Sequence, residues 1–228
     1  MNRLGRSIFW VLLLGTEILF LSHVKAEVSD FTCGPLQNAY GPYDYRSDMD
    51  KLAIVEGAHF TPEVANLVRG NTAASPGGDI DYTLRAFPNH HAALMSMVRL
   101  GDKEKKAKPS GSRYTVECWL YRAVRFRDND ATVKMIYATY LAKKGSNAEA
   151  LKQLNDAVQL GEDSANLQYN IGLVYFNLGK YDEALNHAHV AYQAGFPLPG
   201  LRDKLKKAGK WKELSASAAS NGEPPRNQ

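Results

Sequence analysis

Most of the side chains that could do acid–base or metal chemistry lie in one stretch, residues 79–91, which reads DIDYTLRAFPNHH. It contains two aspartates, an arginine, an asparagine and two adjacent histidines. Imidazole rings bind metal ions and exchange protons near neutral pH. A metal-dependent or hydrolytic activity centred on His59, His90 and His91 is therefore one hypothesis for this chain.

The spacing of these histidines argues against a metal site on a single helix. Neighbouring residues on a helix point about 100° apart, whereas metal-binding helices place their ligands three or four residues apart. His59 could join His90 or His91 only through the fold. The sequence also lacks G-x-S-x-G, H-E-x-x-H, C-x-x-C and a glycine-rich phosphate loop. We therefore predict no catalytic residues, no metal, no cofactor and no enzymatic activity.

A second interpretation of DIDYTLRAFPNHH is a junction between two helices. Asp79 is a suitable N-cap for a short helix that must end before Pro88. Asn89 can then cap the next helix by accepting from the amide of His91 or Ala92. This interpretation predicts a helix end, a break at the proline and a new helix start.

An internal repeat indicates which elements surround this junction. The segment GSNAEAL at 145–151 recurs as GKYDEAL at 179–185, and alanine recurs at 34-residue steps at Ala123, Ala157 and Ala191. A 34-residue period is typical of the tetratricopeptide repeat.

Residues 165–197, which read ANLQYNIGLVYFNLGKYDEALNHAHVAYQAGFP, closely resemble the tetratricopeptide repeat. Small residues such as Gly172 and Ala184 let two helices approach, and Gly179 supplies a left-handed turn after the first helix. The resemblance implies an all-α fold, a right-handed solenoid of antiparallel helix pairs, preceded by an irregular N-terminal arm. The chain as a whole also resembles exported repeat proteins of bacteria.

The same patterns divide the chain into segments. We predict a signal peptide at 1–26, an irregular arm at 27–58 with a short extended piece at 52–56, degenerate repeat-like helices at 59–127 with a basic insertion at 101–113, two repeats at 128–197, a truncated capping repeat at 198–214 and a disordered tail at 215–228.

The first segment has the features of a leader. A start with two arginines precedes an apolar run at 8–21, and Val24 and Ala26 occupy the small-residue positions before a cleavage site. Cleavage near Ala26 predicts an exported, periplasmic protein whose mature chain has no integral membrane span. Because Glu17 interrupts the apolar run, anchoring by an uncleaved leader is the alternative.

Charge and cysteine content bear on two further properties of the chain, nucleic-acid binding and disulfide formation. The whole chain carries a formal +4, and residues 1–26, with three cations and one carboxylate, account for +2. The remainder is near neutral, which does not predict nucleic-acid binding. The two cysteines, Cys33 and Cys118, form either a disulfide, as pairs in exported proteins often do, or two buried thiols.

The resemblance implies a partner-binding groove lined by the first helix of each repeat. The positions that face a ligand in the family fall here on Asn166, Tyr169, Leu173, Phe176 and Asn177, on Thr132, Met135, Thr139, Ala142 and Lys143, and upstream on Ala92, Met95 and Arg99. This set lacks the cationic clamp that some family members use for C-terminal carboxylates.

Such a groove implies a protein or peptide partner and a scaffold or adaptor role in a cell-envelope complex. The alternative is that the arm around Tyr40–Tyr45 fills the groove. The chain would then be a purely structural subunit of an envelope assembly.

Overall fold

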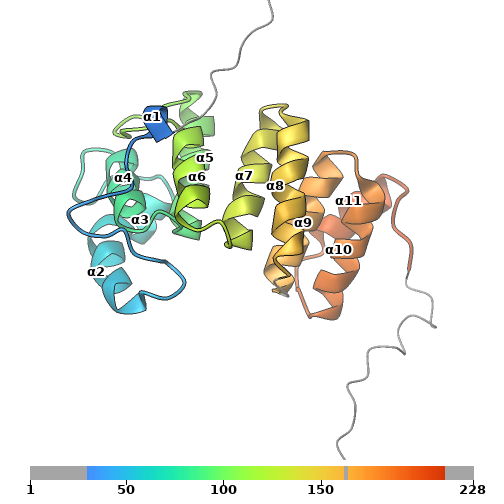
Figure 1. Cartoon of the computed structure of the whole chain (residues 1–228). Helices are drawn as coiled ribbons and strands as arrows, with labels where there is room; N and C mark the ends of the chain where they lie inside the picture. The colour runs from blue at the N-terminus through green and yellow to red at the C-terminus, as the bar shows by residue number, and fades with distance from the viewer. Residues whose placement is uncertain (1–29, 162–163, 214–228) are drawn as a thin grey trace, which may run out of the picture.

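The computed structural model describes residues 30–161 and 164–213, which fold into a stack of helices (Figure 1). No strand occurs in these two ranges, so the all-α fold class is confirmed for them. The helices in chain order are α1 (Asp30–Cys33), α2 (Met49–His59), α3 (Pro62–Ala65), α4 (Pro76–Ala86), α5 (His91–Glu104), α6 (Val116–Phe126), α7 (Ala131–Lys143), α8 (Asn147–Gln159), α9 (Ala165–Asn177), α10 (Tyr181–Gln193) and α11 (Gly200–Lys207).

Two consecutive helix pairs repeat with the predicted 34-residue period, because α9 and α10 begin 34 residues after α7 and α8. The first helix of each pair ends at a glycine in the left-handed region, Gly145 with φ 76° and Gly179 with φ 74°. After α9 the amides of Gly179 and Lys180 donate to Phe176 and Tyr175 at 3.0 and 2.9 Å. Those bonds satisfy carbonyls at the helix end, so a glycine sets the turn into the second helix.

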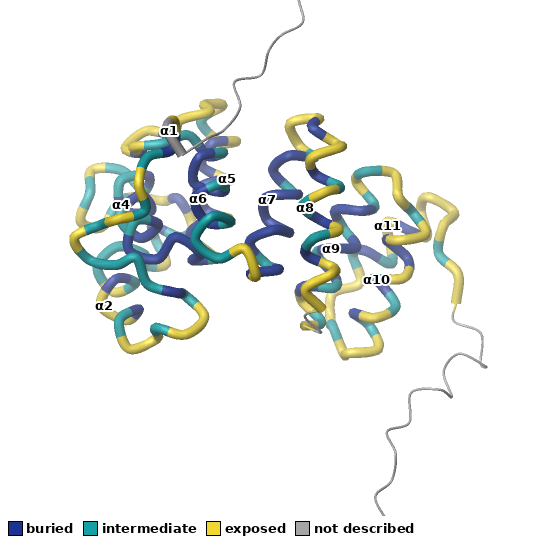
Figure 2. Tube along the Cα trace, in the orientation of Figure 1, coloured by how far each residue is buried: buried dark blue, intermediate teal, exposed yellow. Residues whose placement is uncertain are grey.

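The pairs stack side by side from α2 at one end to α11 at the other (Figure 1). Helices α5, α7 and α9 pack in sequence along the stack, and α8 and α10 each pack on the first helix of their own pair. The buried residues form a continuous layer where neighbouring helices face each other (Figure 2). Burial of these apolar faces holds the helices in the stack.

The stack is closed at its C-terminal end by α11. Its two buried leucines, Leu201 and Leu205, lie against α9 and α10. A Cβ atom placed on Gly172 of α9 would lie only 2.5 Å from Cδ2 of Leu201. The missing side chain at Gly172 therefore gives α11 the room to pack.

The prediction of an extended piece at 52–56 is wrong, because these residues lie inside α2. Leu52 and Val55 are three residues apart and share one face of α2, where they are buried with Phe87 in a small second core. Ile54 points away and is 68% exposed. The apolar run at 52–56 was too short to distinguish a strand from a helix, and packing against α4 decides for the helix. The arm predicted as irregular up to residue 58 thus becomes helical at Met49.

The junction at residues 86–91 has the predicted helix end, break at Pro88 and new helix start, but the residues that cap the helices differ from those predicted. Phe87, which precedes Pro88, has φ −129° and ψ 84°, outside the helical region, so α4 ends where the proline requires it. The prediction that Asn89 caps α5 is wrong, because the Nδ1 atom of His90 accepts from the amide of Ala93 at 3.2 Å. The side chain of Asn89 is used by the N-terminal arm instead.

The prediction that Asp79 caps α4 is also wrong. The helix begins three residues earlier at Pro76, with Ser75 as N-cap, because proline is well suited to the first helical position. Asp79 lies in the first turn and accepts from the amides of Asn71 and Ala73 at 2.7 and 3.0 Å. Its carboxylate thereby orders the loop that precedes α4.

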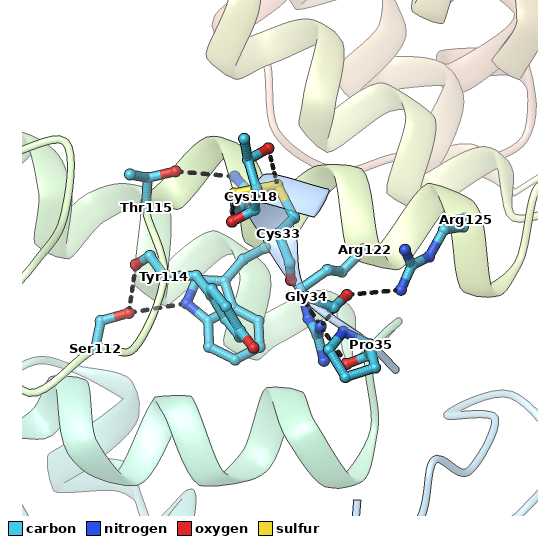
Figure 3. Close-up of a disulfide and its surroundings, with 11 residues drawn as sticks. Cys33, Gly34, Pro35, Ser112, Tyr114, Thr115, Cys118, Arg122 and Arg125 are labelled. Carbon is cyan, nitrogen blue, oxygen red and sulfur yellow. Dashed lines mark hydrogen bonds between the residues drawn. A yellow bond between two sulfur atoms is a disulfide. The ribbon is translucent and has the colours of Figure 1, made fainter. Parts of the chain in front are cut away.

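A disulfide ties the beginning of the described chain to α6: the sulfur atoms of Cys33 and Cys118 lie 2.14 Å apart (Figure 3). Beside it, the buried guanidinium of Arg122 donates to the carbonyl oxygens of Cys33, Gly34 and Pro35 at 2.9, 3.2 and 2.7 Å. The arm is therefore fixed to α6 by a covalent bond and by charge-assisted hydrogen bonds.

Predictions for the leader and the tail lie outside the described residues, since 1–29, 162–163 and 214–228 are not described. Among the described helices, none combines the length and the apolar character that crossing a membrane requires.

Candidate functional site

A cavity of about 350 Å³ opens between α5, α7 and α9. These helices occupy equivalent places in three successive pairs, so their exposed faces form one wall. The lining side chains are apolar or uncharged, apart from one histidine: they are His91, Ala92, Met95, Thr132, Met135, Ile136, Thr139, Asn166, Asn170, Leu173, Val174 and Asn177.

The structure brings most of the residues predicted for the groove to this cavity. Eight of the thirteen positions named for the groove line it, namely Ala92, Met95, Thr132, Met135, Thr139, Asn166, Leu173 and Asn177, and Ala142 does not. Sequence reasoning missed four lining residues, His91, Ile136, Asn170 and Val174. Of these, Asn170 and Ile136 lie four residues after Asn166 and Thr132 on the same helix face. That spacing could have identified both residues.

Two aromatic residues predicted for the groove do not line the cavity. Tyr169 is only 8% exposed, and its ring stacks on Phe196 with centroids 4.2 Å apart. Phe176 is partly buried and meets the ring of Tyr181 edge-on. Both rings fill space between α9 and the elements that follow it, so they belong to the core of the last repeat.

Two cations predicted for the groove also lie elsewhere. Lys143 forms an ion pair with Asp102 at 2.9 Å, across the ends of α7 and α5. Arg99 donates to the carbonyl oxygen of Ala65 at 2.7 Å and thereby joins α5 to α3. Neither residue lines the cavity, which leaves its described wall without lysine or arginine.

Asparagine side chains form a polar stripe along α9. Asn166, Asn170 and Asn177 lie on one helix face, and each amide group offers both donors and acceptors. Asn170 donates to the backbone and side-chain oxygens of Asn166 at 2.8 and 3.0 Å, which fixes that pair. Such amides can bond a peptide backbone, whose donors and acceptors also alternate.

Comparison with protein families decides the nature of these helix pairs. Residues 141–179 match the family described as TPR repeat. The chain contains tetratricopeptide repeats. The match covers the end of α7, all of α8 and all of α9, and it ends before α10, the fourth helix with the 34-residue period. A comparison with curated proteins finds no match.

Upstream of the matched repeat, the structure does not bring the three candidate histidines to one centre. Each ring bonds a different carboxylate: His59 lies 2.9 Å from Asp79, His90 lies 3.0 Å from Glu56, and His91 lies 3.0 Å from Asp130. No group of three or more His, Cys, Asp and Glu side chains in the described ranges is placed to hold a metal ion. Arg85 bonds a fourth carboxylate, that of Asp81, at 2.9 Å.

The group around His59 contains a threonine as well as a carboxylate. Nδ1 of His59 lies 2.7 Å from Oγ1 of Thr72 and 2.9 Å from Oδ1 of Asp79, and the threonine hydroxyl also donates directly to Asp79. In a hydrolytic triad the nucleophile and the acid lie on opposite ring nitrogens. Here both share one nitrogen, so this arrangement orders the loop before α4 and does not activate the hydroxyl.

His90 has a defined protonation state. Its Nδ1 accepts from an amide, so Nε2 must carry the proton that is donated to Glu56. The ring is fully buried between Tyr45, at a centroid distance of 4.3 Å, and Phe60, at 4.8 Å. Burial, together with the neighbouring His91, lowers the pKa of His90 from 6.5 to about 4. The imidazole is therefore neutral at physiological pH.

A buried polar network joins the arm to two turns of the repeat array. The side-chain amide of Asn89 donates to Asp44 of the arm at 2.7 Å and to Asp130 before α7 at 3.0 Å. Its oxygen accepts from the amide of Tyr45 at 2.9 Å. Asp44 also accepts from Arg127 at 2.6 Å. One asparagine thus holds the arm, the α4–α5 turn and the α6–α7 turn together.

The arm does not fill the cavity. The amide of Tyr43 donates to the carbonyl of Ala86 at the end of α4, and Tyr40 and Tyr43 pack around the small core with Phe87. No residue of 36–48 is among those that line the cavity. The described part of the arm therefore supports the repeat array at its turns and leaves the cavity open.

Proposed function

We propose that this chain is an exported binding scaffold that holds a segment of a protein partner in the cavity between α5, α7 and α9. The observation that carries the proposal is the cavity itself, about 350 Å³ in volume and lined by equivalent faces of three consecutive first helices. Pockets of this size and mixed lining accept side chains of a partner.

The lining indicates what kind of segment fits. Met95, Met135 and Leu173 offer apolar surface that a small number of apolar side chains would cover. The amides of Asn166 and Asn177 offer backbone hydrogen bonds. The described wall has no lysine or arginine that could bind a C-terminal carboxylate. The segment is therefore held by shape and by hydrogen bonds to amides, and it need not be the C-terminus of the partner.

Export belongs to the same proposal. The arginine-containing start, the apolar run at 8–21 and the small residues Val24 and Ala26 support cleavage after Ala26. The disulfide between Cys33 and Cys118 supports it independently, because such bonds persist in oxidising compartments. The proposal therefore includes a periplasmic location and a scaffold role in a cell-envelope complex. Mass analysis of the protein recovered from cells should give a chain that begins at Glu27, and an intact Met1 would contradict cleavage.

The cavity can be tested by substituting its amides. Asn166→Ala, Asn170→Ala and Asn177→Ala together remove the polar stripe of α9 without touching the core, since none of the three is buried. The matched control carries Gln159→Ala, Asn186→Ala and Gln193→Ala, which remove three exposed amides from α8 and α10 outside the cavity.

Each chain is crosslinked in cell-envelope extracts and its partners are identified. The wild type and the control should recover the same partner, and the cavity variant should lose it by roughly tenfold or more, as expected when two or more interface hydrogen bonds of about 1 kcal/mol each disappear. Equal recovery by all three chains would contradict a role for the cavity.

A further inference from the structure

The C-terminal end of the stack concentrates the positive charge of the chain. Residues 200–213 contain six cations and two carboxylates, a formal +4 within 14 residues and equal to the net charge of the entire chain. The cations are Arg202, Lys204, Lys206, Lys207, Lys210 and Lys212. They extend from α11 to the end of the described chain.

None of these six cations forms an ion pair with a described residue. At the other end of the stack the opposite holds, because Arg46, Arg85 and Arg127 each pair with a buried or nearly buried aspartate. Of the two carboxylates at the α11 end, Glu213 accepts from the indole of Trp211 at 2.8 Å. After the charges of Asp203 and Glu213 are subtracted, a formal +4 remains at this end, and none of its cations is ion-paired with a described residue.

The way α11 packs keeps this charge on the outside. Leu201 and Leu205 are fully buried on one face, and Lys206, Lys207 and Lys212 are exposed. No further helix of the described chain covers this face, since α11 is the last element of the stack (Figure 1). The α11 end is therefore a free surface in the described chain.

We propose that the α11 end docks on an anionic lipid bilayer. Five of the six cations are lysines, whose flexible point charges suit a diffuse negative surface, whereas recognition of single carboxylates favours the planar fork of arginine. The one arginine, Arg202, stacks over Tyr192 at 4.7 Å. Juxtamembrane clusters of four to eight basic residues are attracted to anionic headgroups in this way.

Apolar groups at the same end fit a lipid surface. Leu198, two residues before α11, is 57% exposed, and Trp211, four residues after it, is half-buried against the core. Tryptophan and exposed leucine are stabilised at the headgroup boundary. No residue of 198–213 lines the cavity between α5, α7 and α9, so the α11 end is a separate surface. The cavity between α5, α7 and α9 stays available to a partner while the α11 end is docked.

The test uses the full chain with a charge variant. Lys206→Gln, Lys207→Gln and Lys212→Gln remove three exposed ammonium groups that form no ion pair and no cation–π contact with a described residue. The matched control carries Lys105→Gln, Lys108→Gln and Lys152→Gln, which lower the net charge equally at exposed positions distant in sequence. Both variants and the wild type have the same N-terminus, so any binding through it is common to all three.

Co-sedimentation is measured with vesicles of phosphatidylcholine alone and with roughly one-third phosphatidylglycerol. The wild type should bind the anionic vesicles more tightly, and each lysine removed should weaken that binding about fivefold, or on the order of 100-fold for three. The control should bind like the wild type, and salt should reduce the difference.

Two outcomes would overturn the proposal. Equal weakening by the control would mean that binding follows total charge and not the α11 end. Binding of the wild type to soluble polyglutamate, with equal affinity for neutral and anionic vesicles, would assign this end to an acidic protein partner.

Discussion

His91 and Asp130 join the cavity to the buried interior: Nε2 of His91 lies 3.0 Å from each carboxylate oxygen of Asp130. His91 lines the cavity at the start of α5, whereas Asp130 is fully buried at the start of α7. Asp130 also caps α7 by accepting from the amide of Val133 at 3.0 Å, and it accepts a second hydrogen bond from the side-chain amide of Asn89. Burial alone would raise the pKa of Asp130, but these hydrogen bonds outweigh it and hold the pKa below its ordinary value.

Asp130→Ala should therefore destabilise the chain strongly. The substitution removes the carboxylate partner of His91, one of the two acceptors of the Asn89 amide and the α7 cap. The expected loss is about 3 kcal/mol in the free energy of unfolding, measured by urea denaturation. Asp128→Ala removes an exposed carboxylate two residues away and should change stability by less than about 0.5 kcal/mol. Equal effects of the two substitutions would contradict a structural role of this carboxylate.

The lowered pKa of His90 predicts that the free energy of unfolding depends on pH between the folded and the unfolded pKa of this residue. Because burial lowers its pKa from 6.5 to about 4, the unfolded chain binds this proton more readily than the folded chain. Stability from this group is thus complete above pH 6.5 and is lost as the pH falls toward 4, by on the order of 2–3 kcal/mol. The groups that face it are Glu56, His91 and the ring of Tyr45.

His90→Gln should flatten this dependence, because glutamine keeps a donor for Glu56 and does not titrate. Urea denaturation at several pH values between 4.5 and 7.5 measures the slope in both chains. The aspartates with lowered pKa values, Asp44, Asp79 and Asp130, contribute stability that is lost only below the unfolded value of 3.8. Their loss lies at lower pH in both chains, so an unchanged slope above pH 4.5 in the variant would exclude His90 as its source.

The repeat could be predicted from the sequence because its signal is local and periodic. Glycine at Gly145 and Gly179 and small residues such as Gly172 fix the turns and the helix spacing directly. The positions of the cavity residues follow from that register, which explains why Asn166, Leu173 and Asn177 line it as expected. The same register wrongly predicted that Tyr169 lines the cavity. Its ring stacks instead on Phe196, a residue outside α9, and is buried in the core.

The N-terminal half could not be predicted in the same way because its contacts are not local. Asn89 looks like a cap in sequence, yet its partners Asp44 and Asp130 lie 45 and 41 residues away. The helix at 52–56 likewise depends on packing against α4. His59, His90 and His91 were candidates for one site, but each ring bonds a different carboxylate, and most of these carboxylates are distant in sequence.

Replacing both cysteines should show how much the arm contributes to stability. Cys33→Ser with Cys118→Ser removes a crosslink across 85 residues of chain. The double variant should lose about 2–4 kcal/mol in the free energy of unfolding. Dithiothreitol should lower the stability of the wild type toward that of the variant and leave the variant unchanged. An effect of the reductant on the variant would show that the disulfide is not its target.

The last prediction concerns two glycines that lie inside helices and differ only in their surroundings. Alanine stabilises a helix interior by about 1 kcal/mol relative to glycine. At Gly57 of α2 nothing lies within 4 Å of the new Cβ, so Gly57→Ala should stabilise the chain by about 0.5–1 kcal/mol. At Gly172 the Cβ would lie 2.5 Å from Cδ2 of the fully buried Leu201. Gly172→Ala should therefore destabilise the chain by about 1–2 kcal/mol net, because overpacking outweighs helix propensity.

The cause can be isolated with a double-mutant cycle. Leu201→Ala alone should cost about 2–5 kcal/mol, because it empties space between α11 and α9. In that background Gly172→Ala should become neutral or stabilising, since its nearest neighbour is gone and the next, the carbonyl oxygen of Ala184, lies 3.3 Å away. Thermal unfolding of the four chains measures the coupling. If Gly172→Ala costs the same with and without Leu201, contact with α11 is not what keeps this position a glycine.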